Sequence, residues 1–384
     1  MLRGVPTAFL RKVLKSERCY STASVFRTLE TNPVQLNESH EGRFYTVQTD
    51  EYKTLFGVSD KGLGLPSDFK IQCTTFRESC IMVRRPFLDI KRCIESYDLS
   101  LPVLRYVLYG AAGVGKTMTL ANLVHYGHAG GFLLVHIPWV PVWTRFAKET
   151  VPSAERPGFV DHTSNSVFWL TFFRHENAKL LAEANLKTSK TYEWSKREST
   201  PEGSSITDII EHGIARPTHA AECICALISE IKLASSEKRI KTMVAIDGIN
   251  GLFVDSGKRI KRDDKTIVPY QNITVFTGFK QLLASDWTGG VVITTVDKLA
   301  VASDLRELDT PRYLLGKDGW EHMDPFIPIN VEKYSHQELQ TTIDYYLDRK
   351  WLQHPLAGTK EARQELETVS VRNPYTLMQL CKSR

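Results

Sequence analysis

The sequence has few cysteines and no pattern that would put them to chemical use. Its 384 residues contain seven cysteines, with no C-x-x-C pair and no cysteine spaced from histidines as in a zinc site. Cys223 and Cys225 lie two residues apart in an apolar helical pattern, where they face different directions. We therefore expect reduced thiols rather than a disulfide framework or a cysteine-based metal site.

Long apolar runs and internal repeats are also missing. No run approaches the 18 or so apolar residues of a membrane-spanning helix. The nearest, residues 131–143, is interrupted by His136, Pro138 and Pro141, and we interpret it as a buried strand that leaves a sheet. With 42% hydrophobic residues, the chain can bury a large core, as one large domain with appendages or as two to three smaller domains.

A strong charge imbalance is absent once the first residues are set aside. Residues 1–20 carry five basic side chains and one acidic one, interleaved with Leu, Val and Phe, which is typical of a mitochondrial transit peptide. Arg18 lies two residues before Tyr20, so we predict cleavage after Tyr20; an ordinary basic terminus is the alternative. Removal of this segment leaves 44 basic and 43 acidic residues. Nucleic acid would then be contacted only through local runs such as 258–262 or 196–197, which solvated loops explain equally well.

What the sequence does contain is a complete phosphate-binding motif. Residues 110–117 read GAAGVGKT and match G-x-x-x-x-G-K-[ST] in every fixed position. An apolar run at 103–109 predicts a buried strand before the motif, and an apolar pattern after Lys116 predicts a helix that Gly127 closes. Strand, glycine loop and helix in this order predict nucleotide binding; a plain glycine turn before a helix is the alternative.

The residue types of the motif suit phosphate chemistry. Gly110, Gly113 and Gly115 allow several backbone N–H groups to approach one phosphate, because no Cβ obstructs the chain. The Lys116 ammonium would reach the β and γ phosphates, and the Thr117 hydroxyl would be a ligand of Mg²⁺. The helix that begins near Gly115 presents the positive end of its dipole to the anion.

The rest of the chain alternates short apolar strands with helices. Five strands are predicted, and because they are apolar throughout we expect a parallel sheet covered on both faces, at 103–109, 131–137, 242–246, 291–295 and 326–331. Helices are predicted at 87–97, 165–185, 206–212 and 220–234, and in a C-terminal lid at 335–349, 360–369 and 375–381. This α/β organisation resembles a P-loop NTPase of the AAA+ and STAND branch. We divide the chain into the transit peptide 1–20, an arm and small mixed segment 21–98, a nucleotide-binding domain 99–332 and the helical lid 333–384.

Asp247 ends the third of these strands and is the predicted partner of Thr117. There it would hold Mg²⁺ through bound water, although Asp-Gly is also an ordinary turn dipeptide. Active AAA+ hydrolases usually have Glu at the next position, which is Gly248 here, so we predict no catalytic residue. The Asn250 amide can position a water molecule but cannot take its proton.

Two further positions are candidates for contact with phosphate, and the nucleobase is not specified by a motif. Thr294 or Thr295 could contact the γ phosphate, and Arg372 could act as a second sensor from the lid, although a surface arginine is the commoner reading. Residues 295–298 have the wrong order for the guanine-selecting motif. The sequence therefore does not specify the nucleobase; we expect GTP or GDP, with ATP as the alternative.

Several sequence blocks resemble the death-associated protein 3 family. Besides the phosphate loop, they are WSKREST at 194–200, VAIDGIN at 244–250, LGK at 315–317, DPFIPI at 324–329, YYL at 345–347 and WLQH at 351–354. The resemblance spans roughly residues 40 to 380. It implies a nucleotide-binding protein in the head of the mitochondrial small ribosomal subunit, located in the matrix, with ribosomal RNA and ribosomal proteins as partners. It also implies a pro-apoptotic role that nothing else in this sequence supports.

The resemblance carries the nucleotide role over to residues that match its motifs. These residues are Gly110, Gly113, Gly115, Lys116, Thr117 and Asp247. We therefore expect a structural ribosomal protein that binds a purine nucleotide with Mg²⁺, is at most a weak GTPase or ATPase, and is not a stable homo-oligomer. An active matrix NTPase or assembly factor and a nucleotide-switched pro-apoptotic adaptor are the alternatives.

Overall fold

The structure is a computed structural model that describes residues 26–57, 64–147, 149–254, 260–262, 265–303 and 306–382. The predicted transit peptide and its cleavage after Tyr20 lie outside the described residues, as does part of the basic run 258–262. None of the described helices is both long enough and apolar enough to cross a membrane.

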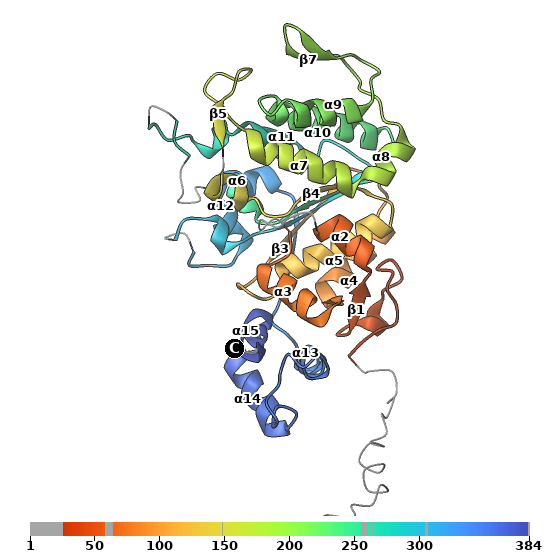
Figure 1. Cartoon of the computed structure of the whole chain (residues 1–384), viewed down its shortest axis with the longest axis vertical. Helices are drawn as coiled ribbons and strands as arrows, with labels where there is room; N and C mark the ends of the chain where they lie inside the picture. Colours follow the sequence, from red (N-terminus) through yellow and green to blue (C-terminus); the bar gives the residue numbers. More distant parts are fainter. Residues whose placement is uncertain are drawn as a thin grey trace, which may run out of the picture.

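A five-stranded parallel sheet forms the centre of the molecule (Figure 1). Each predicted strand is confirmed to within two residues. In spatial order the strands are β11 (Ile327–Asn330), β3 (Leu104–Tyr109), β10 (Gly290–Thr295), β9 (Thr242–Ile246) and β4 (Leu133–Ile137). Every neighbouring pair is parallel. The carboxyl ends of the strands, which the predicted site residues follow, therefore meet at one edge of the sheet.

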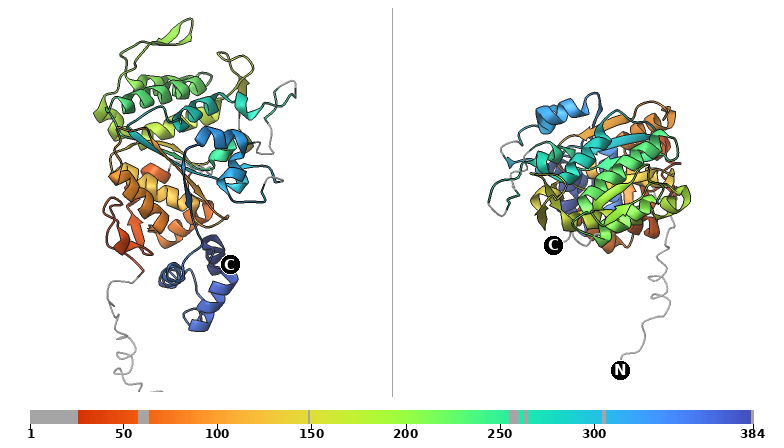
Figure 2. Two further views of the ribbon diagram at one scale, coloured as in Figure 1. Left: turned by 180° about the vertical axis from the view of Figure 1, so that it is seen from behind. Right: turned by 90° about the horizontal axis from the view of Figure 1, so that it is seen from above.

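The strands are apolar throughout because helices cover both faces of the sheet. Tyr106 and Leu108 of β3 pack into one hydrophobic cluster, whereas Val107 between them packs into another on the opposite face. The first face is covered by α4 (Arg85–Ser96) and α5 (Lys116–Ala129). The second is covered by α7 (Thr163–Glu176), α9 (Ile206–Ala215), α10 (Ala220–Ser236), α11 (Thr274–Leu283) and α12 (Pro311–Met323). Figures 1 and 2 show these two helical layers on either side of the sheet.

The N-terminal segment packs directly on the first layer. It comprises η1 (Glu38–His40), β1 (Phe44–Val47), α2 (Thr49–Phe56), α3 (Ser67–Phe76) and β2 (Ser79–Met82), with β1 and β2 antiparallel. The Tyr45 hydroxyl donates to Asn122 Oδ1 over 3.0 Å and lies 3.0 Å from His125 Nδ1, both on α5. Leu36 is fully buried, so the residues expected to form an extended arm are tied to the core from Phe26 onward.

The C-terminal helices form a separate layer at one end of the molecule, confirming all three lid helices. They are α13 (His336–Asp348), α14 (Lys360–Ser370) and α15 (Pro374–Cys381). Their apolar residues pack with Phe26, Phe44 and Phe76 of the N-terminal segment. In Figure 1 they lie at the bottom, at the opposite end from the β7 hairpin.

The long connection between β4 and β9 contains elements that the sequence did not predict. They are α6 (Pro141–Arg145), the hairpin β5 (Thr150–Pro152) with β6 (Val160–His162), and the hairpin β7 (Tyr192–Ser195) with β8 (Glu198–Thr200). Helix α8 (Ala178–Ala184) lies within the helix predicted at 165–185. The remaining 3₁₀ turns are η2 (Ile249–Leu252), η3 (Tyr270–Asn272) and η4 (Lys298–Ala300). The β7–β8 hairpin projects from the body of the molecule (Figure 1).

Two sequence-based boundaries were wrong. Helix α5 continues through Gly127, which is there because a Cβ would lie 2.6 Å from Met243 Sδ of the sheet. The helix expected at 165–185 is two helices, broken at Asn177, whose side chain accepts from Leu134 N over 2.7 Å. The strand predicted at 131–137 ends at Ile137 as expected, and the chain then leaves the sheet through α6, which Pro141 begins.

Candidate functional site

The glycine-rich loop joins β3 to α5 and has the backbone that its glycines permit. Gly110, Gly113 and Gly115 have φ values of 133°, 80° and 100°, which residues with a Cβ rarely adopt. A Cβ on Gly110 would lie 2.5 Å from the Val331 carbonyl oxygen, so a side chain would also clash with the residue that follows β11. The loop conformation therefore depends on these glycines.

Every carbonyl group of the loop from residue 110 to residue 115 accepts a hydrogen bond. Lys116 Nζ donates to the Gly110 and Ala111 oxygens over 2.8 and 3.0 Å. Thr119 N donates to the Gly115 oxygen over 2.9 Å, as the first bond of helix α5. The other three carbonyls accept from outside the loop: Ala112 from Asn373 Nδ2 (2.9 Å), Gly113 from Tyr375 N (3.1 Å) and Val114 from Arg84 Nη1 (2.7 Å).

The N–H groups of the same loop are used differently. Within the described part of the chain, no hydrogen bond is donated by the main-chain N–H groups of residues 111 to 115. A loop whose carbonyls are all engaged while its N–H groups remain available has the polarity of an anion-binding concavity. Helix α5 begins directly after it and adds the positive end of its dipole.

Thr117 and Asp247 meet as predicted. The Thr117 hydroxyl donates to Asp247 Oδ2 over 2.7 Å, which joins the start of α5 to the end of β9. The other carboxylate oxygen accepts from the Thr295 hydroxyl, which in turn accepts from Gly248 N over 2.9 Å. Thr295 thus touches the carboxylate, while Thr294 donates to the Tyr106 carbonyl oxygen over 2.9 Å inside the sheet.

Burial shifts the pKa values of two charged side chains in this cluster. Desolvation raises the pKa of Asp247 to about 6, and the nearby Asp297 adds to the shift. Desolvation also lowers the pKa of Lys116, against the pull of Asp297 and Asp247. A buried carboxylate with a raised pKa gains from a cation placed beside it.

A cavity of about 290 Å³ lies against the loop. Gly113, Gly115, Lys116, Thr117 and Asp247 line it, so the structure brings these predicted site residues to one space. Gly110 is not in the lining; its carbonyl holds Lys116. The apolar part of the wall comes from β2, α3, the start of α5, η4 and α15, and includes Phe69, Met82, Met118, Leu299, Tyr375 and Met378.

Asn250 lies behind the cavity rather than in its wall. Its amide donates to the Asp297 carbonyl oxygen over 2.9 Å and accepts from Asp297 N over 3.0 Å, and the residue is fully buried. Asn250 therefore holds together the segments that follow β9 and β10. Asp297 itself lines the cavity, with its carboxylate accepting from Trp139 Nε1 (3.2 Å) and Leu299 N (3.0 Å). Asp297 follows β10, the parallel strand beside β9, and this position is the sequence signal that could have identified it as a site residue.

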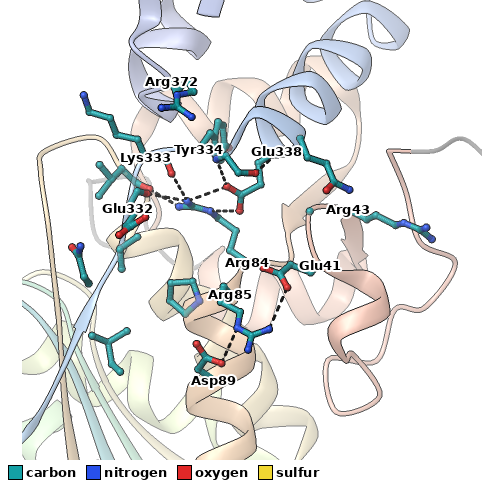
Figure 3. A pocket seen from close by; sticks show the side chains of 18 of the residues that line it. Glu41, Arg43, Arg84, Arg85, Asp89, Glu332, Lys333, Tyr334, Glu338 and Arg372 are labelled. Carbon is teal, nitrogen blue, oxygen red and sulfur yellow. Dashed lines mark hydrogen bonds and ion pairs between the residues drawn. The ribbon is translucent and has the colours of Figure 1, made fainter.

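Arg84, just before α4, is a loop contact that the sequence did not reveal. Besides Val114, its guanidinium contacts Glu338 of α13 over 2.9 Å and the Glu332 carbonyl oxygen over 2.9 Å (Figure 3). It is buried, and it lies 5.0 Å from the centre of the Tyr334 ring. Nothing in the sequence around residue 84 indicates partners some 250 residues away.

Arg372, weighed as a second sensor, lies on another cavity. This cavity of about 1000 Å³ shares Arg84 with the first cavity and is lined also by Arg372, Lys333, Glu332 and Arg85 (Figure 3). Arg372 is absent from the lining of the cavity that holds Lys116 and Asp247. Its lid neighbours Asn373 and Tyr375 contact the loop instead.

Fold and site together define a parallel α/β protein with a glycine-rich loop after a central strand and a buried carboxylate at the end of a nearby strand. Comparison with known sequences then identifies the group within this class. The model of the family described as "Mitochondrial ribosomal death-associated protein 3" matches residues 81–380, and the chain belongs to this family. Membership confirms the predicted mitochondrial matrix localisation.

Two relatives resemble the chain over nearly its whole length. The small ribosomal subunit protein mS29 of Bos taurus is 34% identical over 376 residues, covering 98% of this chain and 92% of the relative. The protein of the same name from Mus musculus is 31% identical over 399 residues and covers all of both chains. The resemblance stated from the sequence motifs is therefore confirmed.

Proposed function

We propose that this protein is a structural component of the mitochondrial small ribosomal subunit, bound to its ribosomal RNA and proteins, that holds a purine nucleotide with Mg²⁺. The ribosomal part rests on the names of its relatives and its family. The proposed nucleotide binding rests on the glycine-rich loop. The observation that carries it is the state of the main-chain groups of residues 110 to 115. Their carbonyls are engaged and their N–H groups are available beside Lys116.

The residues present also fit Mg²⁺. Thr117 and Asp247 offer hard oxygen ligands 2.7 Å apart next to the loop, and Mg²⁺ prefers such ligands together with phosphate and water. Burial raises the pKa of Asp247 to about 6, so a cation placed beside the carboxylate would favour its charged form. A bound Mg²⁺ would neutralise phosphate charge; Thr117 and Asp247 would orient it.

Several features favour retention of the nucleotide over its hydrolysis. Gly248 provides no side chain to take a proton from water, and its N–H is engaged with Thr295. The carboxylate of Asp297 is held by Trp139 and Leu299, and the Asn250 amide by Asp297. We therefore infer slow or no turnover, with GTP or GDP as the expected ligand and ATP as the alternative.

The first experiment identifies the ligand. The matrix form is purified, its nucleotide is released by denaturation and identified by mass spectrometry, and cleavage of fresh triphosphate is then measured. We expect near one equivalent of purine nucleotide and very slow cleavage. Turnover on the order of 10 per second without a partner would contradict the structural role.

A matched pair of variants tests the site. Lys116→Ala removes the ammonium from the loop and should lower nucleotide occupancy at least about tenfold, because a charge-assisted contact to phosphate is lost. Lys317→Ala, on the exposed face of α12, is the control and should retain the ligand. Co-sedimentation with small subunits is measured for both; we expect Lys116→Ala to lower it. Normal occupancy in Lys116→Ala would contradict nucleotide binding at this loop, whereas loss of co-sedimentation in both variants would point to a surface effect.

A further inference from the structure

The β7–β8 hairpin carries the WSKREST block at 194–200, which the nucleotide site does not use. The hairpin projects at the end of the molecule opposite the lid (Figure 1). One of its side chains, Glu198, faces two histidines from the body of the protein, His212 in the last turn of α9 and His219 just before α10. Three donor groups from three elements thus converge on one point.

The donor atoms are spaced as a small metal site requires. His212 Nε2 and His219 Nδ1 are 3.0 Å apart, and Glu198 Oε2 is 4.0 Å from His219 Nδ1. All three donor atoms lie within 4.8 Å of one another. Ligands placed about 2.0–2.2 Å from a tetrahedral zinc ion are roughly 3.3 Å apart. The two imidazole rings lie at 13° to each other with their centres 5.2 Å apart, so both rings must turn for one ion to contact both nitrogens.

The surroundings of Glu198 leave one of its oxygens for such an ion. Arg216 Nε and Nη2 both contact Oε1, over 2.8 and 2.7 Å, and Oε2 is the oxygen turned towards the histidines. A carboxylate fixed through one oxygen by a hydrogen-bonding neighbour is a common arrangement around metal ligands. The Trp194 ring, 5.3 Å from the His212 ring at an angle of 18°, restricts the orientation of that imidazole.

We propose that Glu198, His212 and His219 bind a divalent transition-metal ion of the zinc class. Two imidazoles and one carboxylate suit zinc and disfavour Mg²⁺ or Ca²⁺, which take oxygen ligands. All three residues are partly exposed, so a water molecule can complete the coordination. The ion fastens the projecting hairpin to the α9–α10 connection. This site is independent of the proposed nucleotide.

The competing explanation is a metal-free pair in which one imidazole N–H donates to the other ring, with Glu198 serving only Arg216. Both explanations account for the 3.0 Å separation. They differ in whether added metal binds and whether it changes the hairpin.

Metal titration separates the two explanations. The metal-free full chain is titrated with ZnCl₂ by calorimetry, and with Co²⁺ by visible absorption, in a buffer containing Mg²⁺. We expect one equivalent to bind, and His212→Gln, His219→Gln and Glu198→Gln to weaken zinc binding by about 100-fold or more for the histidines and about 10-fold or more for the glutamate. His336→Gln is the control, since His336 pairs with Glu367 on the exposed lid.

A second readout reports on the hairpin without depending on affinity. Lys196 and Arg197 are exposed between β7 and β8 and are cut by trypsin. Zinc should slow this cleavage several-fold in the natural chain and leave it unchanged in His212→Gln, with circular dichroism confirming that the variant folds. Absence of zinc binding, or equal binding by the natural chain and all three variants, would overturn the proposal.

Discussion

At the scale of single residues, the site depends on one buried carboxylate. Burial of Asp247 away from water raises its pKa from 3.8 to about 6, although the hydrogen bonds that it accepts from Thr295 and Thr117 act in the opposite direction. The rise means that the folded chain binds this proton more tightly than the unfolded chain. Above that pH, the charged form of Asp247 therefore lowers the free energy of unfolding of the metal-free protein.

The sign of the resulting pH dependence follows directly. Without nucleotide and Mg²⁺, the free energy of unfolding should fall as pH rises from about 4 to above 6, by about 3 kcal/mol, because each pKa unit corresponds to about 1.4 kcal/mol. Asp247→Asn cannot titrate and should lack this component. Denaturant unfolding of both proteins between pH 4 and pH 8 measures the difference, and identical pH profiles would show that Asp247 is not the group responsible.

Residues of the site differed in how far the sequence revealed them. Lys116, Thr117 and Asp247 were predicted because local motifs and a strand end specify them. Asp297 and Arg84 were not, since their partners come from other parts of the chain: Trp139 for Asp297, and Val114 with Glu338 for Arg84. Their roles exist only once the strands and the lid are assembled.

At the scale of elements, Arg84 links the loop to the lid. It donates to Val114 of the loop and to Glu338 of α13, both over less than 3 Å (2.7 and 2.9 Å). Arg84→Met should lower the free energy of unfolding by about 3–5 kcal/mol, because it leaves Glu338 buried without its partner, and should speed nucleotide release. Chemical denaturation and the rate of release of a fluorescent nucleotide measure the two effects.

Arg85 is the matched control for this prediction. It neighbours Arg84 but is half exposed and pairs with Glu41 and Asp89 at the surface (Figure 3). Arg85→Met should cost no more than about 1 kcal/mol. The double variant with Glu338→Gln should recover part of the loss in Arg84→Met, and no recovery would count against the buried ion pair as its cause.

Helix packing provides a second element-scale prediction. The buried residues of α9 include Ile206, Ile209, Ile210 and Gly213, a stripe with helical spacing that faces α7 and α10. A Cβ on Gly213 would lie 2.5 Å from Leu170 Cδ1 and 2.9 Å from Cys223 Cβ. Gly213→Ala should therefore destabilise the protein by about 1–3 kcal/mol, despite the higher helix propensity of alanine.

Gly358 is the control position, because a Gly-to-Ala change there adds a methyl group without a clash. A Cβ there meets nothing within 4 Å, and its φ is not in the left-handed region. Gly358→Ala should be neutral or stabilise the chain by up to about 1 kcal/mol. Thermal unfolding of both variants measures the two effects. Equal stability of the two variants would mean that α9 moves away from α7 and α10 without loss of free energy of unfolding.

At the scale of the whole molecule, the candidate site joins three parts of the chain. The sheet supplies Asp247, the N-terminal segment supplies Arg84, and the lid supplies Asn373 and Tyr375, which contact the loop carbonyls. The proposed ligand on the loop would therefore bind only the state in which these parts are assembled. Its binding free energy should stabilise the whole fold.

Removal of the ligand tests this linkage. Mg²⁺ and nucleotide at 100 times their dissociation constant should stabilise the purified chain by about 2.7 kcal/mol and raise its melting temperature by roughly 3 °C. Dialysis against a chelator followed by nucleotide removal should reverse the rise, as measured by scanning fluorimetry. Lys116→Ala should show little change, and an equal rise in that variant would indicate binding elsewhere.

The sequence by itself determined the features that depend on neighbouring residues. The five apolar strands, the glycine loop, the lid helices and the family were all predicted, because local periodicity, turn residues and motifs specify them. The tertiary structure alone decided the strand order, the break at Asn177, the position of Gly127 within α5 and the linkage of loop to lid through Arg84. These depend on contacts between residues far apart in the chain, which one sequence does not encode in any local pattern.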